Sequence, residues 1–108
     1  MPILKLSILI PCFNEVATIE QIVAKALAAD TAGLEREIIL VDDGSTDGSS
    51  AIIGDLAQRH ANVEACQHER NAGKGAALRT GLARSVGNIV LIQDADLEYD
   101  PADYPRLL

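Results

Sequence analysis

Three acidic residues at alternate positions follow a short apolar run near the end of this chain. The run is Ile89–Ile92, and the acids are Asp94, Asp96 and Glu98. Side chains at alternate positions of an extended segment point the same way, so these carboxylates can converge on one cation. Mg²⁺ and Mn²⁺ prefer such hard oxygen ligands and keep positions open for phosphate oxygens. The spacing predicts a divalent metal ion held against a phosphate; the alternative is a set of solvated loop acids, with Asp94 as a cap.

A second acidic pair, Asp42 and Asp43, follows the apolar run Ile38–Val41 and opens the segment Asp42–Gly48. Its glycines permit positive φ, and its Ser, Thr and Asp residues favour turns and helix N-caps, so a tight strand-to-helix turn explains most of this segment. Such a turn does not require two consecutive carboxylates. One of them could accept hydrogen bonds from a nucleobase or a ribose.

Two further segments lie where strand-to-helix turns are expected. Pro11–Glu15 contains no glycine, so a pyrophosphate cannot approach its backbone closely and a dinucleotide cofactor is not expected. Glu15 could also be a helix N-terminal acid stabilised by the helix dipole. Asn71–Gly75 lacks the spacing and the hydroxyl residue of a Walker ATP-binding loop, which excludes that site. Lys74 is either a contact to phosphate or ribose, or a solvated lysine.

Patterns typical of strands and helices alternate along the chain. Strands are expected near residues 6–12, 37–42, 63–68 and 88–93, and helices near residues 16–29, 49–60, 73–85 and from about 100–103 onward. In the third helix, Ala76, Ala77, Leu78 and Leu82 are available for packing. This alternation predicts an α/β fold whose parallel sheet has strand order 3-2-1-4, with helices on both faces. Ligands of such sheets bind outside the carboxyl ends of the strands.

Composition limits the possible functions. The 108 residues form one domain at most, and a net charge of −7 with only three aromatic residues argues against a nucleic-acid-binding protein. The N-terminal apolar run is too short for a membrane span and lacks the features of a signal peptide. Cys12 and Cys66 are expected to be buried, reduced thiols of a cytoplasmic protein. His60 and His68 show no ligand spacing and are expected to be surface or packing residues.

Taken together, these segments resemble the family 2 glycosyltransferases of GT-A fold in their order and spacing. They are Ile10–Glu15, Val41–Gly48, Asn71–Gly75 and Asp94–Glu98. The most similar branch is the polyprenyl-phosphate (dolichol-phosphate) mannosyl- and glucosyltransferases, especially over Asp94–Pro101. The resemblance covers nearly the whole chain. It implies inverting transfer of a sugar from a GDP- or UDP-linked donor, with a polyprenyl phosphate at the membrane surface as the possible acceptor.

The resemblance also implies roles for individual residues. The residues expected to surround the base and ribose are Pro11, Phe13, Glu15 and Asp42, with Asp43 as the alternative to Asp42 and with Lys74 as a further nucleotide contact. The residues expected to hold Mg²⁺ or Mn²⁺ on the diphosphate are Asp96 as the main ligand, Asp94 as a ligand to metal or ribose, and Glu98 as a third ligand. Where the family often has Tyr in the first loop, this chain has Phe13, which retains stacking on a base but not a hydroxyl contact.

Residues 1–108 are expected to be the donor-binding, N-terminal part of a longer enzyme, because the sequence ends within the first turns of a helix. The family's acceptor pocket and carboxylate base would then follow Leu108, so no catalytic residue is assigned here and the chain alone is expected to be inactive. General-base assistance is worth about 10²–10⁴-fold in rate. The strand near residues 88–93 would lose its cover, and a homodimer through that strand or the terminal helix is expected.

Three other protein classes share some of these features. A phospho-acceptor receiver domain is also small, acidic and α/β, but it needs an acid pair after its first strand, where this chain has Pro11 and Cys12. A sugar-nucleotide pyrophosphorylase needs a glycine-rich loop after its first strand, and this chain lacks one there. A non-catalytic nucleotide-sugar-binding module of the same ancestry would share every motif, and only a transfer assay would separate it from an enzyme.

Overall fold

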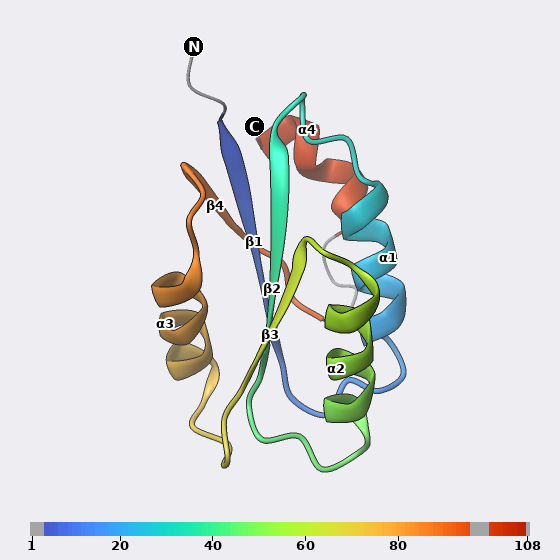
Figure 1. The fold of residues 1–108 in the computed structure, drawn as a ribbon, viewed down its shortest axis with the longest axis vertical. Helices are drawn as coiled ribbons and strands as arrows, with labels where there is room; N and C mark the ends of the chain where they lie inside the picture. The colour runs from blue at the N-terminus through green and yellow to red at the C-terminus, as the bar shows by residue number, and fades with distance from the viewer. Residues whose placement is uncertain (1–3, 96–99, 108) are drawn as a thin grey trace.

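A computed structural model describes residues 4–95 and 100–107, and these form a parallel sheet covered by helices on both faces (Figure 1). The strands are β1 (Lys5–Cys12), β2 (Glu35–Asp42), β3 (Val63–Gln67) and β4 (Ile89–Ile92). The helices are α1 (Ile19–Ala28), α2 (Ser49–Arg59), α3 (Lys74–Arg84), the 3₁₀ turn η1 (Pro101–Asp103) and α4 (Tyr104–Leu107). The sheet order is β3-β2-β1-β4, which confirms the predicted order.

The side-chain alternation of β1 and β2 divides the core into two layers. Ile8, Ile10, Ile38 and Leu40 belong to the larger cluster beneath α1 and α2, whereas Leu9, Ile39 and Val41 belong to a smaller cluster with Ala77 of α3. Because both faces of these strands are buried, their sequences are nearly continuous apolar runs, as expected for a central parallel sheet. Figure 1 shows α1 and α2 on one side of the sheet and α3 on the other.

Helix α3 packs on the sheet through small residues, which corrects one expectation. Ala77 and Gly81 are buried against the sheet, and a Cβ on Gly81 would lie 3.3 Å from the methyl groups of Leu9. Leu82, which was expected to pack, is 49% exposed. A ridge of small residues brings the helix axis close to the sheet and leaves the larger side chain on the outer flank.

Two predicted elements differ at their ends. Helix α1 begins at Ile19 rather than near Val16, because residues 15–18 form a turn in which the Glu15 carbonyl accepts from the Thr18 and Ile19 amides at 3.1 and 2.9 Å. Strand β4 spans Ile89–Ile92 rather than residues 88–93; it lies at the sheet edge, as the predicted order requires, where it pairs with Leu6–Leu9 of β1 and leaves Val90 and Ile92 39% and 49% exposed.

Both cysteines are unpaired and buried, as predicted. Among the helices in the described ranges, none combines the length and the apolar content needed to cross a bilayer.

Two loops at the carboxyl edge of the sheet approach each other closely at Gly44. Its φ is +77°, and a Cβ there would lie 2.5 Å from the Asn71 amide nitrogen and 2.6 Å from the Arg70 carbonyl carbon. Only glycine permits both the left-handed backbone and this close approach between the loop after β2 and the loop after β3.

We predict that Gly44→Ala lowers the free energy of unfolding by about 1–3 kcal/mol, because the backbone strain adds to a clash with main-chain atoms. The matched control is Gly54→Ala within α2, where no atom lies within 4 Å of the added Cβ. That change should stabilise the helix by about 0.5–1 kcal/mol. Urea denaturation of both variants measures the two effects. Equal unfolding midpoints for Gly44→Ala and the unaltered chain would show that the loops do not need this contact.

Candidate functional site

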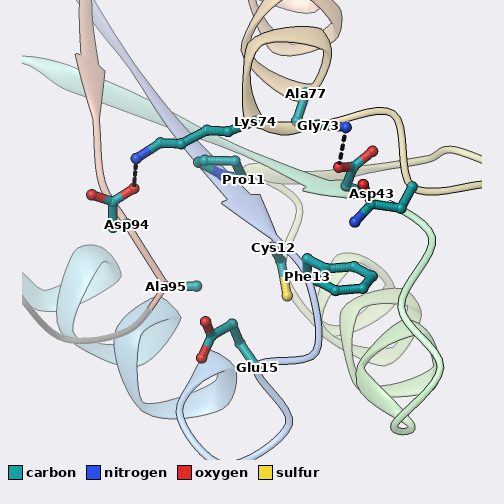
Figure 2. A pocket seen from close by; sticks show the side chains of 11 residues that line it. Pro11, Cys12, Phe13, Glu15, Asp43, Gly73, Lys74, Ala77, Asp94 and Ala95 are labelled. Carbon is teal, nitrogen blue, oxygen red and sulfur yellow. Dashed lines mark hydrogen bonds and ion pairs between the residues drawn. The ribbon is translucent and has the colours of Figure 1, made fainter.

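A cavity of about 440 Å³ opens at the carboxyl edge of the sheet, next to the first turn of α3 (Figure 2). Its lining combines the loops that follow β1, β2, β3 and β4, and consists of Pro11, Cys12, Phe13, Glu15, Asp43, Asn71, Gly73, Lys74, Ala77, Asp94 and Ala95. The segments selected from the sequence therefore meet at one place. Of the residues predicted to bind nucleotide, Asp42 is not part of this lining. Asp96 and Glu98 lie outside the described residues.

The loops after β1 and β2 are joined by hydrogen bonds between backbone amides and short polar side chains. The Asn14 amide donates to Ser45 Oγ at 2.9 Å, and the Thr46 amide donates to Asn14 Oδ1 at 2.7 Å. The Glu15 amide donates to Ser49 Oγ at 3.0 Å. Most of the polar residues between Ser45 and Ser49 thus hold the first loop, which presents Phe13 and Glu15 to the cavity.

Strand alternation separates the roles of the two consecutive aspartates. Asp42 continues the side of β2 that faces α1 and α2; its Oδ1 accepts from the Ser45 amide at 2.9 Å and its Oδ2 from the Ser50 hydroxyl. Asp43 continues the opposite side, toward α3, and lines the cavity. The structure thus places the alternative residue, Asp43, where Asp42 was first expected, and it gives Asp42 contacts that hold the start of α2.

Asp43 is the centre of a buried hydrogen-bond network. Its Oδ1 accepts from the Ala72 amide at 2.9 Å, its Oδ2 accepts from the Gly73 amide at 2.9 Å, and Oδ1 lies 2.8 Å from His68 Nδ1. Burial alone would raise the pKa of Asp43, but the hydrogen bonds from Ala72, His68 and Gly73 outweigh it and hold this pKa below its ordinary value. The carboxylate therefore remains charged at neutral pH.

An ion pair joins the other side of the cavity. Lys74 Nζ lies 2.6 Å from Asp94 Oδ1, so the first residue of α3 reaches across to the end of β4 (Figure 2). The backbone beyond β4 is anchored independently, because the Thr18 hydroxyl donates to the Ala95 carbonyl at 2.5 Å. The buried Tyr104 hydroxyl donates to Gln93 Oε1 at 3.0 Å, and Gln93 Nε2 donates to the Asp94 carbonyl at 3.1 Å. Asp94 is therefore held at a defined place within the cavity.

Two residues at the carboxyl end of β1 differ in what they offer to a ligand. Phe13 is 44% exposed and lines the cavity, so its ring is available to stack on a planar group. Cys12 also lines the cavity but is 2% exposed, and burial raises the pKa of its thiol to about 11. A thiol in this state is a packing group rather than a nucleophile.

Sequence reasoning missed one residue of this region. His68, expected to be a surface or packing residue, lies between Asp43 and Thr80, with its Nε2 2.7 Å from Thr80 Oγ1. Its position directly after β3, beside the carboxyl end of β2, was the available signal. Within residues 4–95 and 100–107, no three His, Cys, Asp or Glu side chains are arranged to hold a metal ion, and two of the three predicted ligands lie outside these ranges.

Comparison with known proteins identifies the family. The model of glycosyl transferase family 2 matches residues 7–108. The chain belongs to glycosyltransferase family 2. A curated relative, the undecaprenyl-phosphate 4-deoxy-4-formamido-L-arabinose transferase of Edwardsiella ictaluri, is 38% identical over 104 residues, which are 94% of this chain and 32% of that protein. The chain thus spans about a third of this relative's length.

Solved structures of glycosyltransferases share the fold. The mannosyltransferase PcManGT from Pyrobaculum calidifontis, in complex with GDP-Man and Mn²⁺, aligns with a TM-score of 0.77 and 28% identity over 91% of this chain and 29% of that chain. TarS 1-349 of S. aureus, in complex with UDP-GlcNAc, aligns with a TM-score of 0.74 and 28% identity over 85% of this chain and 26% of that chain. The predicted family and the GT-A fold are confirmed.

The network around Asp43 predicts a specific pH dependence of stability. Because the folded pKa of Asp43 is depressed, its contribution to stability is complete above the unfolded pKa of about 3.9 and is lost as the pH falls through the folded pKa. Asp43→Asn should cost about 1–3 kcal/mol at pH 7, since an amide cannot accept all three bonds. The cost should shrink below about pH 4.

Chemical denaturation of the unaltered and Asp43→Asn chains between about pH 3 and about pH 7 measures this profile, because this range spans the ordinary carboxyl pKa of about 4. Asp55→Asn is the control, because Asp55 forms an exposed ion pair with Arg59 on α2 and should change stability little. A cost for Asp43→Asn that stays constant across this range would contradict the assignment.

Proposed function

We propose that this chain is the donor-binding part of an inverting glycosyltransferase, which transfers a sugar from a nucleotide diphosphate sugar to a polyprenyl phosphate. The observation on which this rests is the arrangement of side chains around the cavity (Figure 2). An exposed aromatic ring, Phe13, and a deprotonated carboxylate, Asp43, lie on one side, and the Lys74–Asp94 pair lies on the other. The first side suits a base and a ribose, and the second suits a diphosphate with its counter-ion.

The donor class is supported by the relatives of known structure, since PcManGT was solved with GDP-Man and TarS with UDP-GlcNAc. A base of either kind can stack on Phe13, so the donor remains GDP- or UDP-linked. The acceptor class is supported by the curated relative, whose name specifies undecaprenyl phosphate. An acceptor of this kind lies at a membrane surface, and the protein would work there.

A divalent cation fits the chemistry of the end of β4. Asp94 Oδ1 already contacts a cationic group, the Lys74 ammonium, at 2.6 Å. Asp94, together with Asp96 and Glu98, would hold Mg²⁺ or Mn²⁺, and hard carboxylate oxygens suit both ions. When bound, the ion would stabilise the negative charge that develops on the departing diphosphate. Lys74 would then turn its ammonium from Asp94 to a phosphate oxygen of the donor, and Asp43 would hold the turn from which Lys74 begins.

We propose that the acceptor side of the reaction depends on residues that this chain does not contain. The chain spans 32% of the length of its curated relative. We expect the carboxylate base and the acceptor pocket to come from a part of that length which this chain does not match. Without the acceptor pocket and its base, the acceptor phosphate is not held in position beside the donor sugar, and this chain alone should bind the donor without transferring its sugar.

Self-association of this chain is also proposed. Strand β4 pairs with β1 along one edge, and the apolar side chains of Ile89, Val90 and Ile92 are 37%, 39% and 49% exposed. Uncovered edge strands of this type pair with other chains, so a two-fold dimer through β4 or α4 is expected. A monomer mass in light scattering would contradict it.

Calorimetric titration tests the proposed function. UDP-, GDP- and dTDP-linked sugars are added to the chain with and without Mn²⁺, and at least one donor should bind with an affinity that depends on the metal. Asp96→Ala should abolish that dependence, whereas Asp55→Ala, which removes an equal charge from α2, should preserve it. If Asp96→Ala binds the donor with unchanged dependence on Mn²⁺, the metal assignment is wrong. Formation of a polyprenyl-phosphate sugar by this chain alone would show that no base is missing.

A further inference from the structure

His68 connects three parts of the structure although it does not line the cavity. It follows β3, and its amide donates to the Asp42 carbonyl at 2.8 Å, which extends the pairing of β2 with β3. Its ring lies between Asp43 Oδ1 at 2.8 Å and Thr80 Oγ1 at 2.7 Å. The His68 side chain is 18% exposed and the Asp43 side chain is 5% exposed. The imidazole is therefore held at both ring nitrogens in a mostly buried position.

The chemistry of these partners assigns the hydrogen on the ring. A deprotonated carboxylate only accepts hydrogen bonds, so His68 Nδ1 donates to Asp43. The Nε2 atom lies within hydrogen-bond distance of the Thr80 hydroxyl, which can donate to it or accept from it. His68 thus bridges a carboxylate of β2 and a side chain of α3, and it restricts the rotation of that carboxylate.

The orientation of Asp43 matters because its two oxygens bind consecutive amides. Ala72 and Gly73 donate to Oδ1 and Oδ2, both at 2.9 Å, and the next residue is Lys74. Gly73 is the N-cap of α3 and has no side chain to cap the helix, with φ at 96°. The carboxylate of Asp43 therefore fixes the turn from which Lys74 reaches Asp94.

We propose that His68 is a positioning residue for the donor site. By donating to Asp43 it fixes the carboxylate that holds the 72–73 turn, and through that turn it places Lys74 on the diphosphate side of the cavity. This inference rests on the proposed function, because it assigns His68 a role in binding a nucleotide diphosphate sugar. Small displacements of a binding group are costly, and a shift of about 1 Å can reduce rates by about 10²-fold.

Three substitutions of His68 distinguish the contributions of its two ring nitrogens. His68→Asn carries an amide nitrogen bonded to Cγ, as Nδ1 is, and so retains a donor toward Asp43. His68→Gln places its nitrogen one bond further out, where Nε2 lies, and His68→Leu removes both. Calorimetry with UDP and GDP in the presence of Mn²⁺ should give His68→Asn an affinity within about threefold of the unaltered chain. His68→Gln and His68→Leu should bind about tenfold more weakly, because Lys74 is then displaced from its place. His60→Leu, which alters the histidine after α2, is the control and should bind as the unaltered chain does.

A second measurement does not require nucleotide. Hydrogen exchange and amide proton shifts of Ala72 and Gly73, followed by NMR, report directly on their bonds to Asp43. Both amides should lose protection in His68→Leu and retain it in His68→Asn. If the unaltered chain binds no nucleotide, the proposed function fails. The exchange protection of the Ala72 and Gly73 amides then still shows whether His68 positions the turn. If His68→Leu does not fold, the comparison of Asn with Gln decides the question.

Either of two results would overturn the inference. One is a folded His68→Leu chain with unchanged nucleotide affinity and unchanged protection of Ala72 and Gly73. The other is an equal loss of nucleotide affinity in His68→Asn and His68→Gln, since a hydrogen-bond donor at the Nδ1 position would then make no difference.

Discussion

The parallel sheet places several carboxylates at one edge. The structure depends on hydrogen-bond donors and cations that neutralise them there. Asp42 ends β2, and Asp43 and Asp94 follow β2 and β4, whose carboxyl ends face the same way; unpaired charges gathered there would repel one another. Asp42 is bound by Ser45 and Ser50, and Asp43 by two backbone amides and His68. These donors are fixed by the fold. Asp94 differs, because it pairs with the ammonium of Lys74, a half-exposed and flexible side chain that an inorganic cation could replace.

This difference divides the edge into a scaffold and a site. The polar segment between Asp42 and Ser49 forms most of its hydrogen bonds with the loop after β1 and with the start of α2. The first loop is thereby held with Phe13 and Glu15 facing the cavity. Gly44 brings the loop after β3 against the same segment, so that Asp43 can reach the amides of Ala72 and Gly73. The residues that the first loop presents to the cavity are therefore positioned by short hydrogen bonds between loops.

Much of this arrangement could be predicted from sequence periodicity, because buried parallel strands must be apolar on both faces and right-handed crossovers restrict their order. The meeting of four loops at one edge followed from that order. The separate roles of Asp42 and Asp43 could also have been read from alternation along β2, since Asp42 shares a side with Leu40 and Asp43 with Val41. The role of His68 could be predicted only in part: the pairing of β2 with β3 places it beside Asp43, whereas Thr80 is brought to it by the packing of α3. The exposure of Leu82 likewise depends on how closely Gly81 lets that helix approach.

In the proposed function, Asp94 binds a divalent cation at the place where it now holds the Lys74 ammonium. The most direct test is the affinity for Mn²⁺ without nucleotide, measured by electron paramagnetic resonance for the unaltered chain and for Lys74→Met. Removing the competing ammonium should raise the affinity for Mn²⁺ severalfold, and the same change should weaken the binding of a nucleotide diphosphate. Arg79→Met, which removes an equal charge from α3, should do much less. An affinity for Mn²⁺ that stays the same or falls in Lys74→Met would contradict this account.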